Sequence, residues 1–335
     1  MSRGDVRIHE VAPEEWDRLL EGFPDRTVFH SLGWLKAVER AYGYRLVLAA
    51  ARTDAGCVAV WPCVEKRKFT LRVLGSPMPG TSTPYLGPLF APGADVPAVV
   101  AAFLKDSTVG RHAFFACRTW ELSGEPVNLE PAFTRLLRFE TLLIDLTRTE
   151  EELWAGLTSE CRNRVRKARK SGFTVRVEPD GGFLDEFWSL SVEVFAKSHR
   201  LPTYSKDFLR HMWNNLASEG RVLALSAFLG EERAATLVLP YDHQNVYYWA
   251  GGARSRFNTL APGNLLHWEA FLEARRRGLS RYDFVSSKGD AGRFKRTFGP
   301  TPRDVATHWE RSRSRLVAAL KRRYTAHLYR KQRVK

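Results

Sequence analysis

RVLALSAFLGEERAATLVLPYDHQNVYYWAGGA, residues 221–253, decides the fold. Three runs that are rich in Val, Leu, Ala and aromatic residues are separated by GEER and DHQN, which are typical of turns. The pattern predicts a meander of three strands, the last of them VYYWAGGA (246–253).

Helical and strand-like segments flank this meander. Apolar residues at helical spacing predict helices over 182–199, 205–220 and 264–278, and RYDFVSS (281–287) reads as a further strand. This order of elements resembles that of the GNAT acyltransferase fold. The first half carries a shorter version of it, with helices over 14–23 and 29–43 and a hairpin over 44–67.

The sequence therefore predicts an α/β (α+β) protein of two tandem GNAT-like domains with a cleft between them. We place the first domain at 1–147, the second at 148–302 and a basic C-terminal helical tail at 303–335.

One long helix is predicted at the start of the second domain, in TRTEEELWAGLTSECRNRVRKARKSG (147–172). Thr149 is the expected N-cap and Gly172 the expected stop. An apolar stripe is formed by Trp154, Leu157, Cys161, Val165 and Ala168. Arg162, Arg166 and Arg169 share a different side, which is either a solvated surface or a binding face for a polyanion.

Positive charge is concentrated in two segments. The chain has 335 residues and a formal net charge of +15. Residues 311–335 hold ten Lys/Arg and no acid, and residues 160–170 hold six against one. Such blocks attract nucleic acid, anionic lipid or a phosphorylated substrate.

Other features of the sequence indicate the cellular compartment of the protein and whether it binds a metal. The N-terminus has no apolar stretch of signal-peptide type, so we expect a cytoplasmic protein whose tail can contact the inner face of the membrane. The four cysteines show neither CxxC pairs nor zinc spacing. We expect them to be reduced and mostly buried, and we expect no metal site and no bound cofactor.

Several enzyme classes leave no trace in the sequence. GxSxG, GxxxxGK[ST], GxGxxG and HExxH are all absent. A GNAT enzyme holds the coenzyme A pyrophosphate on a loop with paired glycines before a helix. The corresponding segment, RSRFNTLAPGNLL (254–266), keeps Gly263 but lacks the pair.

An ordered set of motifs resembles the Fem family of aminoacyl-tRNA-dependent peptidyltransferases. The set covers about residues 25–300 and consists of FHSLGWLKAVERAYG, TPYLGPLF, LWAGLTSECRNRVRKARKSG, VYYWAGGA, LAPGNLLHWEAF and GRFKRTFG. The resemblance implies that an amino acid passes from the 3′ ester of its tRNA to an amine acceptor, in the family a peptidoglycan precursor.

The resemblance also implies roles for individual residues. Lys295, in the motif FKRTF, would lie near the reacting ester, and Lys36, in GWLK, would contact acceptor phosphate. Tyr247 and Trp249 would line the substrate site, and Trp249 stands where the family has tyrosine. Two further candidates for substrate binding are Tyr85, in TPYLGPLF, and Tyr204, which stands where an arginine is expected.

The chemistry of such a transfer suits a site without a triad or a metal. An aminoacyl ester is already activated, and an α-type amine with a pKa of about 8 is partly neutral at pH 7. The reaction needs positioning and a cation where the oxyanion develops. Lys295, between Phe294 and Phe298 after a strand end, is the candidate cation, and a surface lysine on an edge strand is the alternative. Asp283 is a candidate for orienting the acceptor amine, and Arg293 and Arg296 for holding phosphate.

We therefore expect an aminoacyltransferase that forms an amide bond with aminoacyl-tRNA as donor, and with its two basic segments on tRNA. An acyl-CoA-dependent N-acyltransferase acting on a sugar or cell-envelope precursor is the first alternative. A non-catalytic module that binds anionic lipid through its tail is the second.

Overall fold

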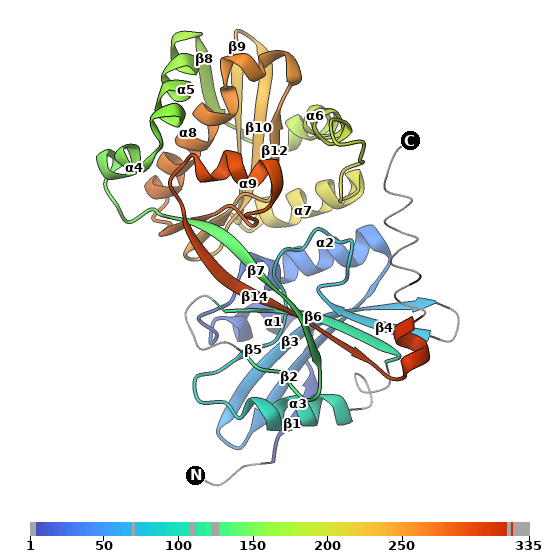
Figure 1. The fold of residues 1–335 in the computed structure, drawn as a ribbon. Helices are drawn as coiled ribbons and strands as arrows, with labels where there is room; N and C mark the ends of the chain where they lie inside the picture. Colours follow the sequence, from blue (N-terminus) through green and yellow to red (C-terminus); the bar gives the residue numbers. More distant parts are fainter. Residues whose placement is uncertain (1–4, 69–70, 107–111, 122–126, 320–322, 324–335) are drawn as a thin grey trace. The chain divides into compact units, whose positions relative to one another are not determined.

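The computed structural model describes residues 5–68, 71–106, 112–121, 127–319 and 323 (Figure 1). These residues divide into two compact units. The first comprises the described parts of Met1–Phe139, Thr203–Met212 and Val305–Lys331, and the second comprises those of Glu140–Pro202 and Trp213–Asp304. Each unit thus takes in segments from both sides of residue 148, where the sequence analysis places its domain boundary.

The first unit is built on a mostly antiparallel sheet in the strand order β1-β2-β3-β4-β6-β14, with β5 beside β3. Its interior contains two apolar clusters, one around Trp61, Phe103 and Phe115 and the other around Trp16 and Leu35. The elements are β1 (Arg7–Glu10), α1 (Pro13–Leu20), α2 (Leu32–Tyr42), β2 (Arg45–Thr53), β3 (Gly56–Lys68), β4 (Leu71–Ser76), β5 (Leu89–Phe90), α3 (Val96–Lys105), β6 (Phe114–Trp120) and β14 (Thr301–Ser312).

The second unit contains the antiparallel sheet β12-β10-β9-β8 and the neighbouring strands β7-β13-β11. Strands β7 and β14 each run from one unit into the other, and α7 begins in the first unit and ends in the second. The elements are β7 (Thr134–Asp145), α4 (Glu150–Gly156), α5 (Ser159–Lys170), β8 (Phe173–Val177), α6 (Leu184–Ala196), α7 (Lys206–Ser218), β9 (Val222–Leu229), β10 (Glu232–Pro240), β11 (Asn245–Tyr247), β12 (Ala250–Ala253), α8 (Pro262–Arg276), β13 (Arg281–Asp283) and α9 (Gly289–Arg296).

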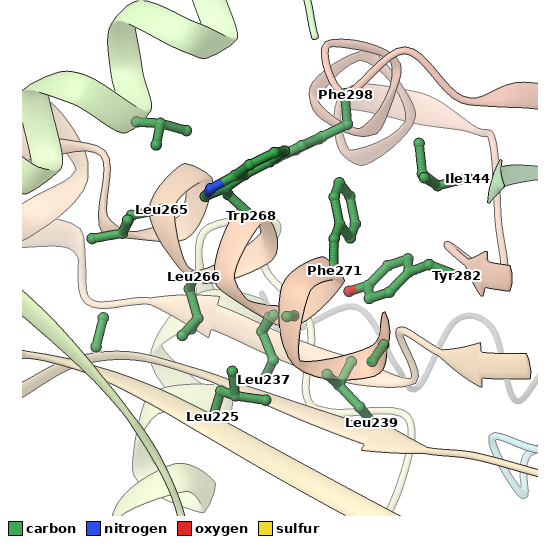
Figure 2. Close-up of a cluster of buried hydrophobic side chains, with 14 of the residues drawn as sticks. Ile144, Leu225, Leu237, Leu239, Leu265, Leu266, Trp268, Phe271, Tyr282 and Phe298 are labelled. Carbon is green, nitrogen blue, oxygen red and sulfur yellow. The ribbon is translucent and has the colours of Figure 1, made fainter. Parts of the chain in front are cut away.

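Helix α8 is the centre of the second unit's core (Figure 2). Its apolar side chains, among them Leu266 and Phe271, pack against Leu225 and Leu237 of β9 and β10. Phe298, which follows α9, lies in the same core, with its ring 5.7 Å from that of Phe271. This burial ties the end of α9 to the body of the unit.

The helix predicted over 149–172 is two helices. Thr149 caps α4 in a capping box with Glu152, as the N-cap prediction requires, and Thr158 caps α5. Leu157 between them is extended, so the apolar stripe is not continuous. Gly172 has a φ of +86°, which suits its predicted position after the end of the helix.

Two further predictions are wrong, and so is the alternative that places Lys295 on an edge strand. The strand predicted over 246–253 is two strands, β11 and β12, which belong to different sheets. Residues 289–296 form helix α9, so Lys295 does not lie on a strand. Residues 301–312 form β14, which pairs with β6, although a helical tail is predicted from 303. Residues 315–319 are helical, and most of the remaining tail lies outside the described residues.

No helix in the described part of the chain is long and apolar enough to cross a membrane.

Candidate active site

Lys295 is a buried cation on α9. Its side chain is 7% exposed, and its Nζ donates hydrogen bonds to the carbonyl oxygens of Phe284 (2.7 Å) and Ser286 (3.2 Å). A buried ammonium group is costly unless acceptors surround it, and these two carbonyls meet that need. The alternative of a solvated lysine on an edge strand is therefore excluded.

The surroundings of Lys295 act on its charge in opposite directions. Burial lowers its pKa from 10.5 to about 8, while the nearby Asp283 carboxylate raises it. The Nζ atom also lies over the ring of Tyr248, 5.2 Å from its centre, where the face of the ring attracts a cation. The group is thus close to half-protonated at mildly alkaline pH.

A buried imidazole completes this cluster. His267 of α8 shares a hydrogen bond of 2.9 Å between its Nδ1 and the Tyr282 hydroxyl, and its ring meets that of Tyr248 edge to face at 4.5 Å. Burial, and then the charge of Lys295, lowers the pKa of His267 to about 3. His267 is therefore neutral at physiological pH, and its protonation would place a second charge beside Lys295.

The break between β11 and β12 brings Tyr248 to the lysine. Tyr248 lies between the two strands, and its amide donates to the carbonyl of Asp283 (2.8 Å). Tyr247 is fully buried in β11, and its hydroxyl donates to Asp242 (2.6 Å). Trp249 is partly exposed. Tyr248 thus has its ring at Lys295, and the substrate-binding roles that the resemblance gives Tyr247 and Trp249 stay predictions.

Asp283 also lies in this cluster, at the end of β13. It is 1% exposed, and its Oδ1 accepts hydrogen bonds from the Thr141 hydroxyl and from the amide of Val285. In this position the Asp283 carboxylate accepts a hydrogen bond from the backbone of the turn that contacts Lys295. The candidate role in orienting an acceptor amine stays a prediction.

Sequence reasoning missed Tyr248 and His267 for different reasons. The alternation of a strand separates Tyr248 from its two neighbours but does not say which set faces the site. His267 stands on a helix that is buried on most of its sides and carries other buried polar residues, so a single histidine gives no signal of its own.

The predicted phosphate-binding arginines have partners of their own. Arg162 donates to the carbonyl oxygens of Ala155 and Leu157 at the end of α4. Arg169 pairs with Glu269 at 2.9 Å, and both Arg166 and Arg169 lie over the ring of Trp154. Arg293 pairs with Asp290 at 2.5 Å, and Arg296 pairs with Glu140 at 2.9 Å. All five remain at least partly exposed, and their proposed role on phosphate stays a prediction.

The other predicted substrate-binding residues belong to the first unit. Lys36 is partly exposed on α2. Tyr85 is buried, with its ring 4.1 Å from that of Trp120, and Tyr204 is 6% exposed just before α7. Tyr85 is therefore part of an aromatic core, and of these three residues Lys36 is the one most open to a ligand.

Residues 157–296 match the model of the acetyltransferase (GNAT) domain family. No curated protein is similar enough in sequence to match the chain.

Solved structures share the fold at low sequence identity. The crystal structure of FemX matches with a TM-score of 0.71 and 13% identity, covering 94% of this chain and 99% of FemX. A tandem GNAT protein from the clavulanic acid biosynthesis pathway matches with a TM-score of 0.58 and 12% identity, over 92% of this chain and 98% of its own. L-PGS from Bacillus licheniformis gives a TM-score of 0.58 at 13% identity, over 98% of both chains. Residues 157–296 therefore match the acetyltransferase (GNAT) domain family, within a mixed α/β fold that the chain shares over most of its length with FemX.

Proposed function

We propose that the protein is an aminoacyltransferase that forms an amide bond, taking an amino acid from aminoacyl-tRNA and passing it to an amine acceptor. The observation that carries this proposal is Lys295, a buried ammonium group inside the GNAT acyltransferase domain. The motifs that resemble the Fem family and the fold shared with FemX support it.

The role of Lys295 follows from the charge that develops during acyl transfer. Attack of a neutral amine on the ester carbonyl forms the C–N bond and places negative charge on the carbonyl oxygen. The C–O bond to the ribose then breaks, and the proton that the nitrogen loses ends on the ribose oxygen, which leaves as a hydroxyl. A preorganised cation stabilises that charge more strongly in a dry site than in water. Two hydrogen bonds to backbone carbonyls hold the Lys295 ammonium in place before the substrate arrives.

The loop before α8 favours tRNA over coenzyme A as donor. In this loop the amide of Ser255, which an anion would need, donates to the Glu193 carboxylate (2.6 Å). Arg254 pairs with Glu186 at 2.9 Å. The first helical position is Pro262, which has no amide hydrogen. A pyrophosphate would meet the negative charge of Glu193 there.

The acceptor carries an amine, and Lys36 is our candidate for holding a phosphate group on it. The basic face of α5 and the tail are our candidates for holding tRNA phosphates, while contact of the tail with a membrane is an alternative use of its charge. The cleft between two domains and the cytoplasmic location stay predictions.

The alternative function is acyl-CoA-dependent N-acylation of a sugar or envelope precursor. It is favoured by the acetyltransferase domain family that residues 157–296 match. The two functions predict opposite responses to RNase and to removal of coenzyme A.

The test is amide formation in a charged-tRNA mixture with a set of amine acceptors, followed by mass spectrometry. We expect activity that RNase abolishes, that survives removal of acyl-CoA, and that Lys295→Met lowers by two to three decades. Activity that depends on acyl-CoA and survives RNase would replace the proposal by its alternative. The matched control is Lys288→Met, which changes an exposed lysine next to α9.

A further inference from the structure

The turn that receives the Lys295 ammonium is strained. Val285 has a φ of +66°, and the amide of Ser286 donates to the carbonyl of Phe284 (2.8 Å). A bond from residue i+2 to residue i around a positive φ marks the rarer and more strained kind of γ-turn. Among the described non-glycine residues with positive φ, Val285 is the β-branched one, and such residues are true outliers there.

The Asp283 carboxylate stabilises this strained turn through hydrogen bonds. Its Oδ1 accepts a hydrogen bond from the Val285 amide at 2.5 Å and another from the Thr141 hydroxyl of β7. Both Asp283 and Thr141 are fully buried, so water does not compete for these bonds. The turn is thereby fastened to a neighbouring strand.

The same turn brings two carbonyl groups to one nitrogen. Residues 284 and 286 would stand about 6.6 Å apart along an extended strand, too far for one ammonium to contact both carbonyls closely. The turn shortens that separation, and Nζ of Lys295 reaches both carbonyls. On the other side, α9 packs so closely that a Cβ on Gly292 would lie 2.0 Å from the Ser287 carbonyl oxygen. Turn and helix together fix the position of Lys295.

We propose that Thr141, Asp283 and the strained turn at Val285 form a positioning device that holds the Lys295 ammonium at the reaction centre. Strained backbone persists where the surrounding structure over-determines it, and it often marks a functional site. Asp283 then acts through Lys295 without touching the substrate. This inference rests on the proposed function only where it concerns the reaction, because the geometry of Lys295 can be measured without it.

The first experiment measures the reactivity of Lys295 without any substrate. Trace labelling with acetic anhydride from pH 6 to pH 10, followed by mass spectrometry of the peptide that contains Lys295, reports how accessible and how protonated the amine is. The titratable groups that act on this amine are Asp283, Tyr248 and His267, and the Tyr282 hydroxyl is bonded to His267.

The variants separate positioning from general stability. Thr141→Val and Asp283→Asn keep the side-chain shape and remove the hydroxyl or the charge. The control Thr236→Val removes another buried hydroxyl, that of Thr236 in β10, which shares a hydrogen bond with Ser226 of β9. Val285→Gly removes the steric cost of the positive φ and keeps the amide that Asp283 needs.

We expect Thr141→Val and Asp283→Asn to raise labelling of Lys295 at pH 7.5 several-fold, because the amine becomes more mobile and, in Asp283→Asn, also less often protonated. Thr236→Val should leave this labelling unchanged at a similar loss of Tm, and Val285→Gly should leave it unchanged without loss of Tm. Equal labelling in the Thr141, Asp283 and Thr236 variants overturns the proposal. Should Thr141→Val not fold, Thr141→Ser restores the hydroxyl and must restore the low reactivity.

The second readout is catalytic. In the charged-tRNA assay, Thr141→Val should lower kcat about 10- to 100-fold with little change in the KM of either substrate, because misplacing a catalytic group acts on the transition state. An unchanged kcat overturns the positioning role. If the wild type itself fails to use charged tRNA, the proposed function fails, while the labelling result still decides the geometry.

Discussion

The ammonium nitrogen of Lys295 lies 5.2 Å from the centre of the Tyr248 ring. These residues come from segments 47 positions apart, the helix α9 and the break between β11 and β12. The ring closes one side of the cation, and the carbonyls of Phe284 and Ser286 take hydrogen bonds from it. The contact thus places an aromatic ring and a positive charge next to each other in the second unit.

Lys295→Arg should separate the charge of the lysine from its other properties. With a pKa of about 8, the lysine loses its proton as the pH rises from 7 to 9, whereas an arginine keeps its charge. If the cation acts on the oxyanion, the activity ratio of the Arg variant to wild type should rise across that range. A ratio that falls above pH 8 would instead identify neutral Lys295 as a base.

Lys295→Met should also destabilise the protein. The change leaves the carbonyl of Ser286 without the hydrogen bond that Nζ donates and removes a donor from that of Phe284. The expected cost is about 1–3 kcal/mol in the free energy of unfolding, measured by urea denaturation. An unchanged free energy would show that the two bonds contribute nothing net.

Tyr248→Leu and Tyr247→Phe should have opposite signatures. Removing the Tyr248 ring takes away the cation–π contact and opens the site, so activity should fall about tenfold, with a modest loss of stability. Removing the Tyr247 hydroxyl breaks its bond to Asp242, which should cost about 1 kcal/mol of stability and leave kcat unchanged. Steady-state kinetics together with thermal unfolding distinguish the two. If Tyr247→Phe lowers kcat more than Tyr248→Leu does, Tyr247, which the resemblance selects, is the tyrosine that acts at the site.

His267 should make the protein less stable in acid. Its pKa is about 3 in the folded protein against about 6.5 in the unfolded chain, so the unfolded state binds more protons between these values. The contribution of neutral His267 to the free energy of unfolding is complete above pH 6.5. It falls as the pH drops towards 3, by up to about 1.4 kcal/mol per pH unit. His30, with a pKa also lowered to about 3 by burial, should contribute a second such term.

His267→Gln should therefore reduce the fall of Tm between pH 7 and pH 5 without abolishing it. The control is His9→Gln, which changes an exposed histidine. An identical pH dependence in the wild type and the His267 variant would contradict a neutral His267 in the folded state.

The exposed lysines of α5 should contact RNA together with the exposed arginines Arg166 and Arg169. Lys167 and Lys170 are exposed, whereas Arg162 is bound to carbonyls at the end of α4. If both lysines touch phosphate, the change Lys167→Gln with Lys170→Gln should reduce the slope of log affinity for tRNA against log salt by about 1.4. Arg162→Gln should lower Tm, because the Arg162 guanidinium donates to the carbonyl oxygens of Ala155 and Leu157. Equal slopes in wild type and double variant would make this face an ordinary solvated surface.

Much of the secondary structure could be predicted from the sequence. The period of the apolar residues gives α2, α6, α7 and α8, and the alternation with turn residues gives the hairpin β2–β3 and the strands β9 and β10. The cap at Thr149 and the stop at Gly172 also follow from local chemistry, because capping and positive φ depend on residues close in the sequence. Lys295 itself was found through a motif, without knowledge of its surroundings.

The other elements were decided only by the tertiary structure, because contacts between segments far apart in the sequence stabilise them. Helix α9 contains Gly289 and Gly292 and has no side-chain N-cap, so local preference for a helix is weak. It forms where Phe298 enters the core and where Gly292 allows close contact with Ser287. The strand β14 looks like part of a basic tail until β6 supplies its hydrogen-bond partners.

The choice of Tyr248 over its neighbours has the same origin. Alternation along a strand states that one set of side chains faces one way, but the pairing of β11 with β13 and of β12 with β10 decides which way that is. The strain at Val285 depends likewise on Thr141, 144 positions earlier in the chain. The sequence by itself therefore determined the local elements and the charge of the site, and packing between distant segments decided how that charge is buried and held.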